Sequence, residues 1–291
     1  MAYNVTNGFD NLSSLSNYVA ENKDIILKDI VFGGEYGNVI PLMQKELGVK
    51  GTAKIHPAKI AAVLQETKGD CGFEAQGDLN LAEVTIETKQ YKVNTEFCAE
   101  HLIGRFAEYK VRVGANPDAL PFEAEIVEGL VKDINKQVEA GVWTALNKIS
   151  VNATTFEEGA TAYDMIMKVY MMMDESILED GIIFVSPTIF REYVKDLVDK
   201  NLYHYNPADG ALEEIFIPGA GVKVRKANGI GRDIVATSPK NMVYATDFMG
   251  NAEEVKVWYS DDDDVYRVKV RFNYGAAFIF PKLVVRGNAG R

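Results

Sequence analysis

The side chains that could bind a metal ion or act as a nucleophile are few in this chain. Two cysteines and three histidines occur in 291 residues, and His56, Cys71, Cys98 and His101 form the only set with metal-ligand character. Cys98 and His101 have a ligand-like spacing, but a closed zinc site uses two such pairs, and His56 and Cys71 lie 15 positions apart. We therefore predict no metal site and interpret both cysteines as reduced packing residues. A hydrolase that uses the Cys98 and His101 pair is an open alternative.

The remaining motifs are typical of turns. Asp261–Asp264 is acidic, but it lacks the spaced ligands, central glycine and bidentate glutamate of a calcium loop, so we predict a solvated hairpin turn. Gly219–Gly221 and Gly229–Gly231 are too short for a dinucleotide or phosphate fingerprint. No Gly-x-Ser-x-Gly sequence occurs. We predict no catalytic residue and no cofactor, and we do not expect an enzyme.

The composition is that of a globular protein with an acidic surface. Hydrophobic residues make up 47% of the chain, and 42 acidic against 31 basic side chains give a net charge of -11. This sign opposes tight binding to phosphates, so sequence-specific DNA binding is not expected. No run approaches the ~20 apolar residues of a membrane helix, and the start lacks a secretory signal. We expect a cytoplasmic protein without a membrane partner.

The first third of the chain has the pattern of extended structure. Residues 1–53 are polar and interrupted by turn signals, which favours an extended arm with one short helical run. In residues 54–98 apolar side chains alternate with a period of two, and the phase slips twice, as β-bulges produce. We predict a long hairpin with an irregular tip. Such a hairpin has too few apolar residues to fold alone, so it must lie against another surface.

A long helix is predicted over residues 121–148. Apolar residues recur every four positions at Phe122, Ile126, Leu130, Ile134, Val138 and Val142. Pro121 suits the first turn, and a helix of this length spans roughly 40 Å.

Residues 161–247 predict a compact α/β unit. A helix over Tyr163–Leu178 precedes a buried strand at Ile182–Val185, and Ser186 caps the next helix. Short strands follow at 214–217, 222–225, 233–237 and 242–245. The five methionines between Met165 and Met173 are interpreted as core filling. Residues 248–291 alternate again, which predicts closing strands at 255–259, 265–272, 277–280 and 283–285.

Several segments resemble, in their amino-acid sequence, coat proteins of phages that infect the Bacteroides group. They lie between about residue 54 and the C-terminus, and none is a catalytic signature. The segments are Leu81–Ile86, Lys92–Cys98, Asp199–Asn206, Ile215–Gly219, Asn241–Asp247, Val257–Ser260 and Phe278–Pro281. The order of the predicted elements likewise resembles the coat fold shared by tailed phages, herpesviruses and encapsulins.

This resemblance implies an α+β tailed-phage major capsid fold. Its parts would be an N-arm (1–53), an E-loop hairpin (54–98), a P-domain with a long spine helix (99–160), a compact A-domain (161–247) and returning P-domain strands (248–291). The E-loop would contact the adjacent subunit through Val84, Ile86, Lys89, Tyr91 and Val93. Tyr91→Asp or Val93→Asp is then expected to leave a folded subunit that assembles poorly.

The implied function is that of a coat subunit without enzymatic activity. Copies would form pentamers and hexamers of an icosahedral head around double-stranded DNA, assembled in the host bacterial cytoplasm and retained in the virion. A separate scaffolding protein, a portal and a decoration protein are the further partners that the resemblance permits. An encapsulin-like compartment is the alternative with the same fold.

Overall fold

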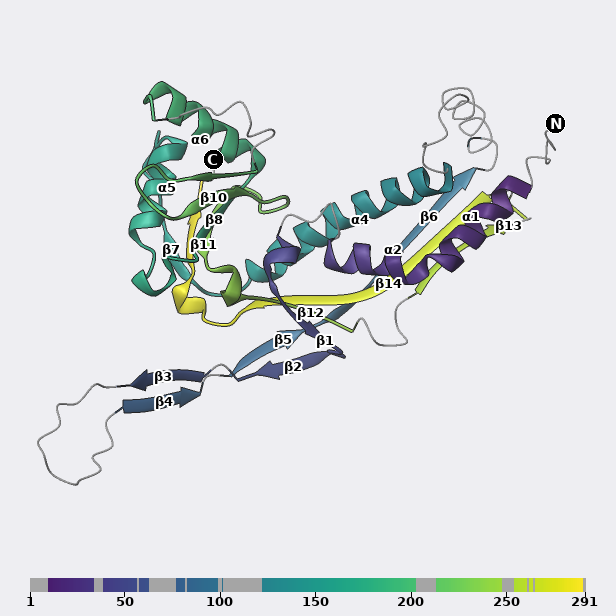
Figure 1. Cartoon of the computed structure of the whole chain (residues 1–291), viewed down its shortest axis with the longest axis horizontal. Helices are drawn as coiled ribbons and strands as arrows, with labels where there is room; N and C mark the ends of the chain where they lie inside the picture. The colour runs from purple at the N-terminus through teal and green to yellow at the C-terminus, as the bar shows by residue number, and fades with distance from the viewer. Residues whose placement is uncertain are drawn as a thin grey trace, which may run out of the picture.

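The computed structural model describes residues 10–33, 39–56, 58–62, 77–81, 83–98, 101, 122–202, 213–247, 254–260, 262–263 and 265–289. The molecule is elongated (Figure 1). A long helix and a sheet form its middle, an α/β unit lies at one end of the helix, and a narrow hairpin projects from the end of the sheet.

The long helix is α4 (Phe122–Leu146), as the four-residue spacing predicts. The stripe buried along it comprises Val127, Val131, Ile134, Val138 and Val142. Trp143 and Leu146 are also fully buried, and the Trp143 ring lies 5.5 Å from that of Phe184 in the α/β unit. Burial of each large side chain stabilises the fold by about 1.5–3 kcal/mol, so α4 is the strut that joins the two ends of the molecule.

The first sheet packs one face against α4. Its strands are β1 (Gln44–Leu47), β12 (Met242–Thr246), β14 (Val265–Phe278) and β13 (Glu254–Ser260), and β14 also pairs with β6 (Lys89–Cys98). Alternate side chains of β14 are buried on the helix side, namely Tyr266, Val268, Val270, Phe272 and Tyr274. The sequence pattern indicated two segments here, but β14 is continuous. Within β14, Gly275 lets the backbone at the end of the hairpin approach the strand, because a Cβ there would lie 2.2 Å from the carbonyl oxygen of Glu87.

Two N-terminal helices cover the same core. The first confirms the one short helical run that the sequence predicts, whereas the second stands where the sequence predicted an extended arm. α1 (Asp10–Glu21) and α2 (Lys23–Phe32) contact α4 and β13. They bury Leu15, Val19, Ile26, Leu27, Ile30 and Val31. The helices are only 12 and 10 residues long, too short to be stable alone, so they depend on α4 as a packing partner. Gly33 (φ 81°) ends α2, and the 3₁₀ turn η1 (Ile40–Leu42) leads into β1.

The second sheet forms the core of the α/β unit. Its order is β7 (Asn152–Thr154), β15 (Val285–Asn288), β11 (Asp233–Thr237), β8 (Ile182–Val185), β10 (Lys223–Lys226) and β9 (Glu214–Phe216). Ile183 and Val185 of β8 pack with α5 (Ala162–Met171) and α6 (Pro187–Asp199), while Phe184 faces the core of α4. Burial on both faces explains the continuous apolar run of β8.

The predicted helix starts of this unit are confirmed by their caps. The Thr161 side chain accepts a hydrogen bond from the Asp164 amide, and Ser186 Oγ accepts one from the Ile189 amide at 3.3 Å. Three 3₁₀ turns complete the connections: η2 (Glu175–Ile177), η3 (Pro239–Asn241) and η4 (Pro281–Leu283).

The two sheets exchange strands in a way that the predicted boundaries miss. β12, predicted within the 161–247 unit, belongs to the sheet on α4. Conversely, β7 and β15 lie in segments that were predicted outside that unit. β15 pairs with strand β11 of the unit, and β7 pairs with β15. Strand pairing between segments 30 or more residues apart decides membership, and local periodicity carries no information about it.

The hairpin has two antiparallel pairs, β2 (Thr52–Ile55) with β5 (Val84–Glu87) and β3 (Ala58–Ala62) with β4 (Gly77–Leu81). It therefore ends at Glu87, because β6 pairs with β14 over ten residues. Among the helices that the structure describes, none is long and apolar enough to cross a membrane.

Candidate assembly surfaces

At the base of the hairpin, Thr88 joins its two strands to each other. Its amide donates to the Gly51 carbonyl at 2.6 Å, and its hydroxyl accepts from the Gly51 amide at 3.0 Å. Beside it, Ile86 is buried against Val49, Val243, Ala245 and Ala277. The base is thus part of the body, whereas the pair β3 and β4 extends beyond it (Figure 1).

The five residues predicted for inter-subunit contacts have different surroundings. Ile86 is 1% exposed within its own chain, so its prediction as a contact is wrong. Val84 is half-buried beside the same cluster, and Val93 is half-buried against the core of α4. Lys89 and Tyr91 are exposed in β6. The predicted alternation was present, but which face meets the body depends on the partner strand.

Tyr91 is the most prominent apolar side chain near the hairpin base. It is 39% exposed, and its ring stacks on that of Tyr274 with a centroid distance of 4.3 Å. Burial raises the pKa of Tyr274 well above its ordinary value, so this ring is neutral at physiological pH. An exposed aromatic ring held by an aromatic neighbour is typical of a contact surface.

Other apolar side chains are exposed on the α/β unit. Phe216, on the edge strand β9, is 56% exposed, and Met171 at the end of α5 is 76% exposed. Met165 and Met173 are buried, so the interpretation of the methionines as core filling is right for these two and wrong for Met171. The helical period of α5 separates the two kinds of methionine.

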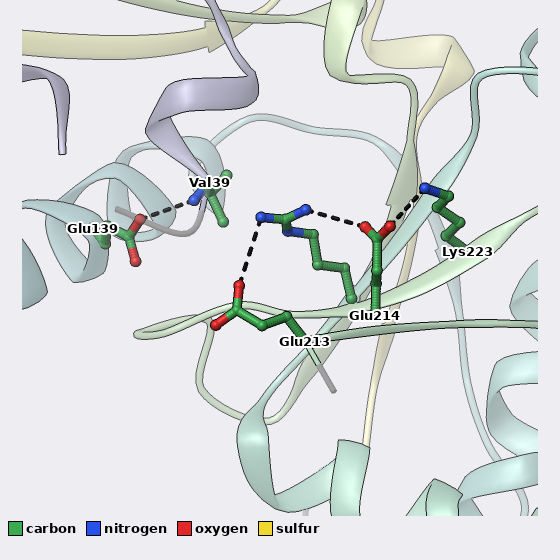
Figure 2. Close-up of polar contacts among 6 residues, drawn as sticks. Val39, Glu139, Glu213, Glu214 and Lys223 are labelled. Atoms are coloured by element: carbon green, nitrogen blue, oxygen red, sulfur yellow. Dashed lines mark hydrogen bonds and ion pairs between the residues drawn. The ribbon is translucent and has the colours of Figure 1, made fainter. Parts of the chain in front are cut away.

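Polar contacts join the segment before η1 to α4, and they join β9 to β10 within the α/β unit (Figure 2). Buried Glu139 of α4 accepts a hydrogen bond from the Val39 amide at 2.8 Å. On β9 and β10, Glu214 pairs with Lys223 at 2.6 Å and with Arg225 at 3.1 Å, and Arg225 also lies 3.9 Å from Glu213. The hydrogen bond from Lys223 is the main cause that lowers the pKa of Glu214. The positive charges of Lys223 and Arg225 lower it further.

The C-terminal end of α4 is capped from β15. Arg286 donates to the carbonyl oxygens of Leu146 at 2.9 Å and Asn147 at 3.0 Å, at the end of the helix where carbonyls lose their regular helical partners. The Asn147 side chain in turn donates to Asp233 at 2.9 Å. Burial lowers the pKa of Arg286, although its ordinary value is high enough to keep the guanidinium charged. Sequence reasoning missed this cap because its partners lie 140 residues apart.

The residues considered for metal binding or catalysis are scattered. His56 and His101 are exposed, Cys98 is half-buried at the end of β6, and Cys71 lies outside the described residues. Of the acidic turn, Asp261 and Asp264 also lie outside them, while Asp263 pairs with Arg267. In the described part of the chain, no group of three or more His, Cys, Asp or Glu side chains could hold a metal ion.

Comparison with known proteins gives matches among solved structures alone. No family model matches the chain, and no curated protein matches it. A chain of the satellite phage P4 procapsid aligns with a TM-score of 0.57 and 9% identity over 96% of this chain and 97% of that chain. A virus-like particle from Pyrococcus furiosus gives 0.56 and 9% over 95% and 99%, and the capsid of cyanophage P-SCSP1u gives 0.54 and 11% over 88% and 89%.

The chain therefore has the fold of phage capsid subunits, as its element order predicts. The alignments span nearly the whole of both chains, so the likeness concerns the fold as a whole. At identities this low, the alignments show the fold alone. The function has to be argued from the surfaces of this chain.

Proposed function

We propose that this protein is the major capsid subunit of a tailed phage. Copies form pentamers and hexamers, which close into an icosahedral head around double-stranded DNA. The observation that carries the proposal is the projecting hairpin on a body with the capsid-subunit fold. A two-stranded hairpin is at most marginally stable alone, and the cover that β3 and β4 need comes from a neighbouring subunit.

The acidic surface fits a container for DNA. With a net charge of -11, most of the subunit surface repels phosphate, so packaged DNA is enclosed without sequence-specific binding. As part of the same proposal, the head is assembled in the host bacterial cytoplasm and becomes the virion shell. A separate scaffolding protein, a portal and a decoration protein are the proposed partners. The proposed relationship to coat proteins of Bacteroides phages rests on the similarity of short sequence segments.

The test is to express the chain alone and to examine it by negative-stain microscopy and sedimentation velocity. Closed shells, tubes or flat sheets of regular capsomers are the expected products. A protein that stays a monomer at high concentration, with and without a co-expressed scaffolding protein, would contradict the proposal.

The second candidate is an encapsulin-like compartment shell. It is favoured by the alignment with the Pyrococcus furiosus virus-like particle, which covers 99% of that chain. Both candidates require self-assembly, so the contents of the particle distinguish them. Particles purified from the native source that contain an enzyme and no DNA would favour the compartment.

A further inference from the structure

The face of the first sheet that points away from the helices carries side chains from three strands. In β14, Val268, Val270 and Phe272 point into the core that α4 shares, so the residues between them point to the other face. Directly paired residues of antiparallel strands share a face. The outer face therefore carries Arg267, Lys269 and Arg271 of β14, Glu96, Asn94 and Lys92 of β6, and Trp258, Lys256 and Glu254 of β13.

This face is basic in an acidic protein. Its nine positions hold five cations and two carboxylates, a net charge of +3, whereas the chain carries -11. We call the five cations, together with the exposed ring of Trp258 among them, the cationic face. The cations are Lys92, Lys256, Arg267, Lys269 and Arg271.

Like charges are placed directly opposite each other on the cationic face. Lys92 pairs in register with Arg271, and Lys256 pairs with Lys269. Such cross-strand pairs are destabilising. Glu254 relieves the second pair, at 2.5 Å from Lys256 and 3.4 Å from Lys269. Within the described part of the chain, no carboxylate lies within ion-pair distance of Lys92 or Arg271, so an anion of another molecule would relieve the first pair.

The cations of β14 form a regular row. Successive members lie two residues apart, which is roughly 6.8 Å at the rise of an antiparallel strand. This spacing is close to the repeat of phosphates along an extended single strand of nucleic acid. Arg267 is already paired with Asp263, so Arg271 and Lys269, with Lys92 beside them, are the members open to further phosphates.

The ring of Trp258 favours one kind of polyanion. It is 40% exposed and lies opposite Arg267 in register. Proteins that bind single strands irrespective of sequence combine cations that follow the backbone with aromatic rings on which bases stack. A duplex keeps its bases stacked inside the helix, and the carboxylates of an acidic peptide offer no ring to stack. The combination of the row with Trp258 therefore fits a single strand best.

We propose that the cationic face binds single-stranded nucleic acid without sequence preference. One phosphate lies between Lys92 and Arg271, the next lies on Lys269, and an unpaired base stacks on Trp258. Because the chain as a whole carries -11, the binding is weak and depends strongly on salt. This activity goes beyond the proposed shell function and does not depend on it.

The test titrates the unassembled full chain with oligothymidylate and follows tryptophan fluorescence. The chain has two tryptophans, and Trp143 is fully buried, so a change in emission reports on Trp258. We expect saturable quenching at low salt with a dissociation constant of about 1–100 µM. The logarithm of the affinity should fall linearly with the logarithm of salt concentration, with a slope of about -0.7 for each phosphate contacted.

Two variants separate the roles of charge and ring, with a fluorescently labelled oligonucleotide as the probe. Lys92→Gln with Arg271→Gln should bind at least about tenfold more weakly at low salt, with a salt slope shallower by about 1.4. It should melt no lower than the wild type, because a repulsive pair is removed. Trp258→Ala should bind at least about fivefold more weakly with an unchanged slope, because the ring carries no charge. The matched control, Lys28→Gln with Lys136→Gln on α2 and α4, should bind like the wild type.

Three results would overturn the proposal. The first is an absence of quenching and of probe binding at low salt. The second is equal binding by the variant of Lys92 and Arg271 and by the control, which would place the contact elsewhere on the chain. The third is binding of a duplex of the same length, or of poly-L-glutamate, as tightly as the single strand, which would identify another occupant of the face.

Discussion

At the scale of single residues, the contact between α4 and β14 is close enough to exclude a methyl group. A Cβ on Gly141 would lie 1.9 Å from the Tyr274 hydroxyl oxygen, and the Tyr274 ring is held by stacking on Tyr91 and Tyr244. Gly129, on the same helix, has nothing within 4 Å of the equivalent position. The two glycines lie in the same helix but differ in their surroundings: Gly141 makes room for Tyr274, whereas Gly129 faces open space.

Alanine at these two positions should have opposite effects on thermal stability. Gly129→Ala should stabilise the protein by up to about 1 kcal/mol, because alanine is the better helix former. Gly141→Ala should cost about 1–3 kcal/mol, as overpacking does. Differential scanning calorimetry measures both. Adding Tyr274→Phe to Gly141→Ala removes the oxygen that clashes and should recover part of the loss. Equal melting temperatures for the two single variants would contradict the close contact.

At the scale of elements, β6 belongs to two surfaces at once. Its pairing with β14 places Val93 toward the core of α4 and Val270, while Tyr91 keeps an exposed edge at the start of the strand. The hairpin leaves the body immediately before it, at Glu87, where Thr88 is fastened to Gly51. β6 therefore anchors the projecting hairpin to the first sheet.

This position separates two substitutions that the sequence treated as equivalent. Tyr91→Asp should leave the subunit folded, at a cost of about 0.5–1.5 kcal/mol for the lost ring stacking, and should weaken assembly. Val93→Asp brings a carboxylate against the core and should lower the melting temperature strongly or give insoluble protein. Far-ultraviolet circular dichroism with thermal melts, followed by sedimentation, separates the two outcomes. A Tyr91→Asp variant that forms shells like the wild type would show that this ring takes no part in assembly.

At the scale of the whole molecule, folding and assembly use different parts of the chain. The two large cores lie around α4 and in the α/β unit, whereas β3 and β4 pair with each other beyond the anchored base of the hairpin. The body can therefore fold without the outer hairpin, whereas the proposed shell function requires it.

Removing the outer hairpin should convert the protein into a soluble monomer. Ile55 and Val84 are the last paired residues of β2 and β5, so an Asn-Gly turn in place of residues 56–83 closes the shortened hairpin. We expect a melting temperature close to that of the wild type and no shells by electron microscopy. An equal deletion product that still forms shells would show that contacts of the body suffice for assembly.

The sequence by itself determined the local elements. The period of α4, the cap at Ser186 and the buried run of β8 are fixed by neighbours a few positions away, and so they were predictable. Only the tertiary structure decided which sheet β12 and β15 join, that α1 and α2 pack on α4, and that Ile86 faces its own chain. These outcomes depend on partners tens to hundreds of residues away, and a periodic pattern shows that a face is apolar without showing what covers it.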